Sequence, residues 1–141
     1  MISFSSTLEI AKVERRINEI TESVIGAAIA VHRELGPGLL ESAYEACLAY
    51  ELNEKKLNVE RQKSIPVIYR GVQLDCGYRL DFLVEDQVVV EVKAVDKLEP
   101  IHEAQIISYL KLSGCKVGLL INFKAKILKH GIRRFVNDFP T

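Results

Sequence analysis

The chain has 141 residues, of which 48% are hydrophobic and 27% are charged, a balance typical of one globular domain. Its 19 Lys and Arg residues match its 19 Asp and Glu residues, which excludes a global electrostatic attraction to nucleic acid. No apolar run approaches the roughly 20 residues that cross a bilayer, and the first residues lack the basic start and apolar core of a signal peptide. We therefore expect a cytoplasmic protein that does not span a membrane.

Two helices are predicted in the first part of the chain. Residues 9–35 carry apolar side chains at steps of three and four, which form one helical stripe: Ile10, Val13, Ile17, Ile20, Val24, Ala27, Val31 and Leu35. Gly36-Pro37-Gly38 then stops this helix, and a second helix is predicted over 39–57. The long stripe could pack on the chain's own sheet or against a second copy, so a homodimer is one expectation.

Extended segments follow these helices. Residues 59–69 and 73–84 are predicted as strands on either side of a turn at Arg70-Gly71, with Gly77 as a bulge in the second strand. Residues 87–95, with the sequence QVVVEVKAV, are strongly β-forming. The connection between 73–84 and 87–95 is too short for anything but an antiparallel hairpin.

The C-terminal part returns to helix and then to strand. Residues 99–112 are predicted as a helix that tolerates Pro100 in its first turn, and 116–122 as a strand buried on both faces. A last helix is predicted over 125–137. Because strand 87–95, the following helix and strand 116–122 can form a right-handed parallel crossover, we expect an α/β (α+β sandwich-like) fold. Its order would be α-α-β-β-β-α-β with a closing helix, and its mixed central sheet would be flanked by helices.

The hairpin brings the chemically informative residues together. With a turn centred near Asp86, Asp81 lies directly across from Glu91, and Arg79 lies across from Lys93. Opposed residues in an antiparallel pair point to one face, with Cβ atoms about 5 Å apart. The other face of the hairpin would be apolar, built from Leu80, Phe82, Val84, Val88, Val90, Val92 and Ala94.

Two opposed carboxylates repel each other, and a hard divalent cation would relieve that repulsion. Mg²⁺ (or Mn²⁺) suits such a site, because Mg²⁺ binds through one or two carboxylates and keeps waters that a substrate phosphate can replace. Lys93 could orient or help to deprotonate an attacking water, or stabilise charge on the phosphate. The alternative is a salt-bridged polar face in which Arg79 and Lys93 neutralise Asp81 and Glu91, and spacing alone leaves both readings open.

A run of motifs carries a resemblance to a known family. Asp81, followed after nine residues by Glu91-Val92-Lys93, is similar to the PD-(D/E)XK nuclease signature, although Cys76-Gly77-Tyr78-Arg79-Leu80-Asp81 lacks its proline, which varies across the superfamily. The chain more specifically resembles the GxxExxY family of that superfamily. Similar segments are GLLESAY at 38–44, YRLDF at 78–82, EVKA at 91–94, HEAQIISYL at 102–110 and GLLINF at 118–123.

The resemblance covers about residues 17–136 and implies one restriction-endonuclease-like domain over 1–141. It implies that Asp81 and Glu91 are metal ligands, with the Val92 carbonyl as a third, and that Lys93 is the catalytic lysine. Glu41 matches a helical acid that approaches the metal, and Gln105 matches a polar residue on the helix after the lysine strand. The function implied is a Mg²⁺-dependent nuclease that hydrolyses phosphodiester bonds. The alternative is a non-catalytic module of the same fold that binds nucleic acid or a protein partner.

Further contacts with nucleic acid are expected from residues around this centre. Helical spacing puts His102, Gln105 and Tyr109 on one stripe that could face the site. Together with Arg79 and Tyr109, the C-terminal basic run is a candidate for phosphate binding, or else an ordinary solvated surface: Lys124, Lys126, Lys129, His130, Arg133 and Arg134.

Several of these residues have structural readings as well. Glu41 could simply complement a helix dipole, and Tyr44 could be a core aromatic with a hydrogen-bonded hydroxyl. His102 could be a first-turn surface residue. Gly36 and Gly38 fit a turn between helices better than a phosphate-binding loop, because no P-loop lysine pattern and no strand accompany them.

Overall fold

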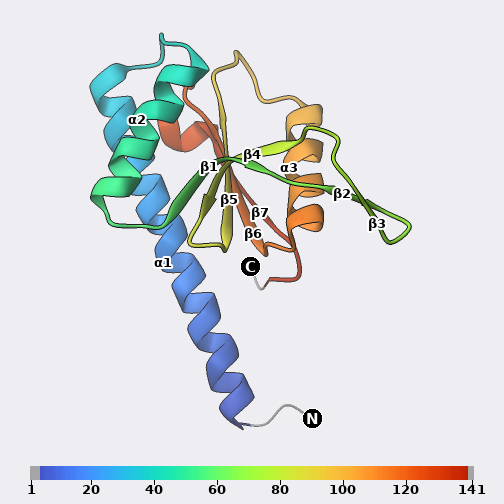
Figure 1. Ribbon diagram of the computed structural model, residues 1–141. Helices are drawn as coiled ribbons and strands as arrows, with labels where there is room; N and C mark the ends of the chain where they lie inside the picture. The colour runs from blue at the N-terminus through green and yellow to red at the C-terminus, as the bar shows by residue number, and fades with distance from the viewer. Residues whose placement is uncertain (1–3, 140–141) are drawn as a thin grey trace.

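A mixed five-stranded sheet between helices forms the body of the computed structural model, which describes residues 4–139 (Figure 1). The elements are α1 (Phe4–Leu35), α2 (Glu41–Glu54), β1 (Val59–Ser64), β2 (Val67–Tyr69), β3 (Val72–Leu74), β4 (Arg79–Val84), β5 (Val88–Lys93), α3 (Pro100–Ser113), β6 (Val117–Asn122), a 3₁₀ turn (Leu128–Gly131) and β7 (Ile132–Val136). The sheet order is β1-β4-β5-β6-β7, and β2 and β3 form a separate ribbon. The ends of the domain expected over 1–141 lie outside the described residues.

Two hydrophobic clusters hold the layers together. On one face of the sheet, α1 and α2 pack against side chains such as Phe82 and Val90. On the other face, α3 packs through Ile106 and Leu110 against residues such as Leu120. Figure 1 shows α1 and α2 on one side of the strands and α3 on the other. The expectation of a mixed sheet flanked by helices is thereby confirmed.

The first helix is longer than the sequence pattern indicated, and only part of its apolar stripe is covered. Ile17, Ile20 and Val24 are buried against the sheet, whereas Ile10 and Val13 remain 47% exposed. Figure 1 shows why, since the N-terminal half of α1 projects beyond the strands. None of the described helices has the length of uninterrupted apolar sequence that a bilayer crossing demands.

The predicted strands over 59–69 and 73–84 are each divided in two. Pro66, which has no N–H to donate, separates β1 from β2, and Gly77 with φ of +76° lies in the link between β3 and β4. As a result β1 pairs with β4 in the main sheet, while β2 and β3 form the separate ribbon. The predicted turn at Arg70-Gly71 is confirmed, with positive φ at both residues.

The predicted centre of the hairpin turn is confirmed. The pairs Phe82–Val90, Leu83–Val89 and Val84–Val88 are all centred on Asp86. Glu85 and Asp86 both have positive φ, of 52° and 54°, as a tight hairpin turn requires. The sheet then continues with β6 parallel to β5, and all six residues of β6 are buried, as expected.

The helix predicted over 125–137 is wrong. A 3₁₀ turn ends at Gly131, and Ile132–Val136 forms β7, antiparallel to β6. An apolar strand such as β6 is unfavourable at a sheet edge, because its backbone N–H and C=O groups would stay unpaired. The β-forming sequence IRRFV pairs with that edge. The turn itself requires glycine at 131, because a Cβ there would lie 2.6 Å from the Asn122 carbonyl oxygen.

Candidate active site

The two acids of the hairpin meet where the regular ladder between β4 and β5 stops. Beyond the Phe82–Val90 pair, carboxylates replace carbonyl groups as partners of the facing backbone. The Asp81 N–H donates to Glu91 Oε2 at 2.8 Å, and the Val92 N–H donates to Asp81 Oδ2 at 2.9 Å. Glu91 is only 3% exposed. Each acid is thus fixed by the opposite strand, and each keeps a second oxygen for another partner.

Burial and proximity make this pair electrostatically unfavourable. Burial, followed by the charge of Asp81, raises the pKa of Glu91 from 4.5 to about 8, against the lowering effects of the Asp81 N–H and Lys93. Burial is also the main cause that raises the pKa of Asp81, and the Val92 N–H opposes it. The ionised forms of both carboxylates are therefore disfavoured, and a bound cation would stabilise them.

Lys93 lies beside the acids without forming an ion pair with them. Its Nζ donates to Gln105 Oε1 of α3 at 3.3 Å, and Gln105 also forms a hydrogen bond with Tyr109. Among residues 4–139, no ion pair joins Lys93 or Arg79 to either acid. The hairpin therefore does not form the alternative polar face, in which direct salt bridges would neutralise the two acids.

A second pair of acids reaches the site from α2. Glu41 begins this helix, and its carboxylate accepts the Ala94 N–H. Partial removal from water raises the pKa of Glu41; Lys93 lowers it and Asp81 raises it, which places Glu41 in the same electrostatic centre. Glu45 lies one turn later and raises the pKa of Asp81. The structure thus brings the predicted Glu41 to the hairpin acids and adds Glu45.

Gln62 of β1 connects these acids and was missed from the sequence. Its Nε2 donates to Glu45 Oε1 at 2.9 Å and to Asp81 Oδ1 at 3.3 Å. The spacing of Glu45, four residues after Glu41 on one helical face, could have identified Glu45 as a candidate. No local pattern could have identified Gln62, because only the pairing of β1 with β4 places it opposite Asp81.

Two residues of the motif segments have structural roles. The Tyr44 hydroxyl donates to the Gly36 carbonyl and accepts the Leu39 N–H at 3.0 Å, and its ring stacks on Phe123 at 4.7 Å. It therefore fixes the turn that precedes Glu41, and the turn reading of Gly36 holds. His102 Nδ1 accepts the Glu99 N–H at 2.9 Å, which makes it part of the cap of α3.

The predicted faces of β4 need a correction near the site. Leu80 packs with Ile65 in the cluster under α3, and not with Phe82 on the other face. Arg79 pairs with Ser64 of β1, because the ladder with β5 ends before it could oppose Lys93. The alternation breaks at Asp81, where the two carboxylates interrupt the ladder.

The C-terminal basic residues do not form one patch. Because β7 is a strand, neighbouring side chains point to opposite faces: Arg133 bonds to Glu103 of α3, and Arg134 bonds to Asn18 of α1. Lys124 forms an ion pair with Asp96 at 2.6 Å. Lys126 and Lys129 line a separate groove beside His32 and Arg33. Contact of these residues with nucleic acid stays a prediction.

The protein side chains at this site would supply only some of the ligands of a hard divalent cation. Among the described residues, no three His, Cys, Asp or Glu side chains are gathered closely enough to enclose a metal ion. Mg²⁺ does not need such a cage, because it binds through one or two carboxylates and completes its shell with water and phosphate. The oxygens of Asp81 and Glu91 that face no backbone N–H match that requirement.

Comparison with known proteins agrees with this geometry. The family model described as the PD-(D/E)XK nuclease superfamily matches residues 18–135, which include the whole sheet up to β7 and all the acids described above. No curated protein and no solved structure matches the chain. Within residues 4–139, three α-helices and a mixed five-stranded sheet have the α+β arrangement of restriction-endonuclease-like folds. The chain belongs to the PD-(D/E)XK nuclease superfamily.

Proposed function

We propose that this protein is a Mg²⁺-dependent nuclease that hydrolyses phosphodiester bonds at the β4–β5 hairpin. The observation that carries the proposal is the buried Asp81–Glu91 pair, whose pKa values are raised and which forms no ion pair with any cationic side chain among residues 4–139. Membership of the nuclease superfamily and the resemblance to its GxxExxY family support the same reading.

Asp81 and Glu91 would hold the cation through their outer oxygens, with the Val92 carbonyl as a third ligand and Glu41 approaching from α2. Bound there, Mg²⁺ would supply a Lewis acid for the phosphoryl oxygen and would lower the pKa of a water. The protein's own contribution is positioning. Each acid is held by a backbone N–H of the opposite strand, so little reorganisation is needed when substrate binds.

Lys93 would act on the water or the phosphate. Its ammonium group donates to the Gln105 amide oxygen, a neutral partner, and lies close enough to the acids to lower their pKa values. Its positive charge can stabilise the phosphate as negative charge develops, and can orient the attacking water. Gln105 therefore serves as a positioning residue for Lys93.

Cleavage assays with defined substrates test this proposal. Single- and double-stranded DNA and RNA are incubated with Mg²⁺, with Mn²⁺ or with a chelator, and we expect cleavage only with metal. Asp81→Asn and Glu91→Gln should abolish cleavage, and Lys93→Ala should lower it by about 10²- to 10⁴-fold. Lys111→Ala, an exposed lysine of α3, is the matched control and should cleave normally.

Calorimetric titration with Mg²⁺ and Mn²⁺ provides a readout that does not depend on activity. Binding that is lost in Glu91→Gln supports the ligand assignment. Cleavage that survives Asp81→Asn and Lys93→Ala unchanged would contradict the mechanism. Metal-dependent binding of nucleic acid without cleavage of any substrate would instead favour the alternative, a non-catalytic module of this fold.

A further inference from the structure

An uncharged groove of about 390 Å³ lies between α3 and the base of the β2–β3 ribbon. Ile101 and Leu112 of α3 form one wall, and Val67 and Tyr78 form the other. None of the described residues that line it carries a formal charge. Its chemistry suits a flat apolar ring with hydrogen-bonding edges better than a phosphate.

The groove adjoins the candidate active site through two shared residues of α3. Gln105 lines the groove and also accepts the hydrogen bond from Lys93. Tyr109 lines it as well, and the charges of Glu91 and Asp81 both act on its hydroxyl. A group bound in the groove would therefore lie beside the acids and the lysine.

Tyr78 provides an aromatic surface in this groove. Its side chain is 47% exposed, and it meets Tyr109 edge to face with ring centroids 6.1 Å apart. The next residue, Arg79, is an exposed cation. An aromatic ring beside a cation is the combination that binds a base together with its phosphate in single-strand binding proteins.

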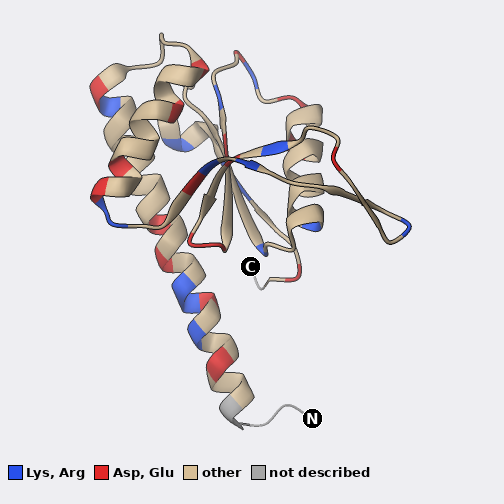
Figure 2. Ribbon diagram, viewed as in Figure 1, with Lys and Arg blue, Asp and Glu red and all other residues tan. Residues whose placement is uncertain are grey.

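The apolar surface continues from the groove along the β2–β3 ribbon. Val67 pairs with Leu74 and Tyr69 pairs with Val72, so these four apolar side chains share one face. Tyr69, Val72 and Leu74 are all exposed. Figure 2 shows the ribbon extending away from the body, with a basic segment at its tip, where the turn contains Arg70. This face of the ribbon is thus apolar along its length, with Arg70 at its tip and both Asp75 and Arg79 near its base.

As an extension of the proposed nuclease function, we propose that this groove binds an unpaired nucleobase of a single-stranded nucleic acid, next to the phosphate at the hairpin acids. A base inside a duplex has both faces stacked and its edge paired, so Tyr78 could reach it only after an unfavourable unpairing step. Single strands present the ring at no such cost. DNA and RNA share the base rings, so both are substrates by this criterion.

Binding measured in Ca²⁺ by fluorescence anisotropy tests the groove separately from cleavage. The probes are labelled oligothymidylate, oligouridylate, an abasic strand of equal length and a duplex, each checked intact afterwards by gel. We expect both base-carrying single strands to bind more tightly than the abasic strand and the duplex. Tyr78→Ala should weaken that binding by about 5- to 150-fold, since stacking is worth about 1–3 kcal/mol per base.

Two controls make the result specific. Tyr78→Phe keeps the ring and should bind as the native chain does. Tyr50→Ala removes another exposed tyrosine, 63% exposed, from α2 on the other side of the sheet, and should also bind normally. Equal affinity for abasic and base-carrying strands, or unchanged affinity in Tyr78→Ala, would overturn the groove proposal even if Mg²⁺-dependent cleavage is intact. Loss of cleavage alone would overturn only the proposed function.

Discussion

Asp81 and Glu91 each accept a backbone N–H from the opposite strand of their hairpin, Asp81 from Val92 and Glu91 from Asp81 itself. This exchange uses the main chain to fix two carboxylates that would otherwise repel each other. The fold therefore carries an unfavourable charge pair in its sheet, which a stable domain does not need. Such a cost is typical of functional sites, where pKa values are strongly shifted.

The stability of the metal-free protein should fall as pH rises from about 4.5 to about 8. Folded Glu91 keeps its proton up to about pH 8, whereas the unfolded chain loses it near 4.5, so the folded state binds more protons in this window. The shifts of Asp81 and Glu41 act in the same direction. In chelator at pH 8, Glu91→Gln should raise the free energy of unfolding, by on the order of 3 kcal/mol.

Thermal melts in chelator between pH 5 and pH 8.5 measure this effect. The native chain should lose melting temperature across the window, Glu91→Gln should flatten the profile, and added Mg²⁺ should restore the native chain at pH 8. Parallel profiles for the native chain and Glu91→Gln would show that Glu91 does not carry the raised pKa.

Gln62 should position Asp81 without contributing to stability. Because its side chain is exposed and bonds to both Glu45 and Asp81, Gln62→Ala should leave the melting temperature within about 2 °C. We expect a roughly tenfold weaker affinity for Mn²⁺ by calorimetry, because Asp81 loses one of its two fixed partners. Gln87→Ala, in the hairpin turn, is the control. Unchanged metal affinity in Gln62→Ala would show that Gln62 does not position Asp81 for metal binding.

Asn122 should be a structural requirement for the end of β6. It is 4% exposed, its Oδ1 accepts the N–H groups of Val95 and Lys124, and its Nδ2 donates to the Val95 carbonyl. Asn122→Ala leaves those backbone groups without partners and should cost about 2–4 kcal/mol in urea unfolding. Asn18→Ala, an exposed asparagine of α1, should cost less than about 1 kcal/mol. Equal losses in the two variants would contradict this account.

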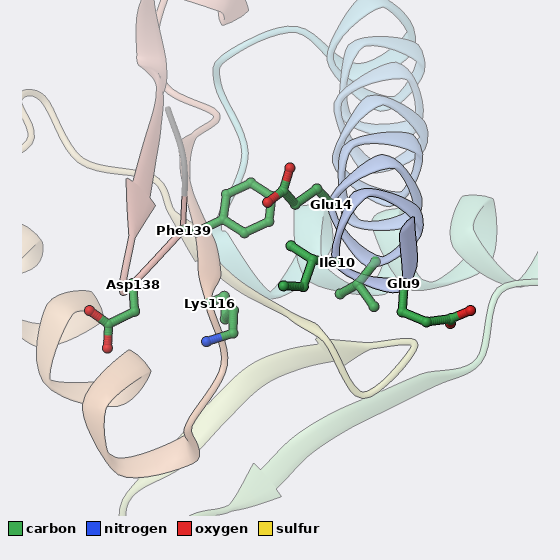
Figure 3. A pocket seen from close by; sticks show the side chains of 7 residues that line it. Glu9, Ile10, Glu14, Lys116, Asp138 and Phe139 are labelled. Atoms are coloured by element: carbon green, nitrogen blue, oxygen red, sulfur yellow. The ribbon is translucent and has the colours of Figure 1, made fainter. Parts of the chain in front are cut away.

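The projecting half of α1 should mediate self-association. Ile10 and Val13 remain exposed and line a groove of about 240 Å³ against Phe139, with charged side chains of Glu14, Lys116 and Asp138 around it (Figure 3). A second copy of α1 could cover this apolar stripe. Sedimentation at several concentrations should detect a dimer, and Val13→Glu should abolish it. A protein that stays monomeric at all concentrations would contradict a role of this stripe in self-association.

Much of the site followed from the sequence because it depends on local periodicity. The centre of the hairpin turn was predicted correctly, and with it the meeting of Asp81 and Glu91 and the apolar face that carries Phe82 and Val90. The motif order correctly predicted the superfamily and brought Glu41 and Gln105 to the same centre. The Asp81–Glu91 relation lies within one hairpin, whereas Glu41 and Gln105 belong to separate helices and were predicted only from the order of the family's motifs.

Only the tertiary structure decided the features that depend on pairing between distant segments. Residues 125–137 were predicted as a helix, but Ile132–Val136 pairs with the edge of β6 as a strand, which sends Arg133 and Arg134 to opposite faces. The place of Gln62 in the site and the groove beside Tyr78 arise in the same way. These features are stabilised by contacts between segments that lie far apart in the sequence, and no local sequence pattern predicts such contacts.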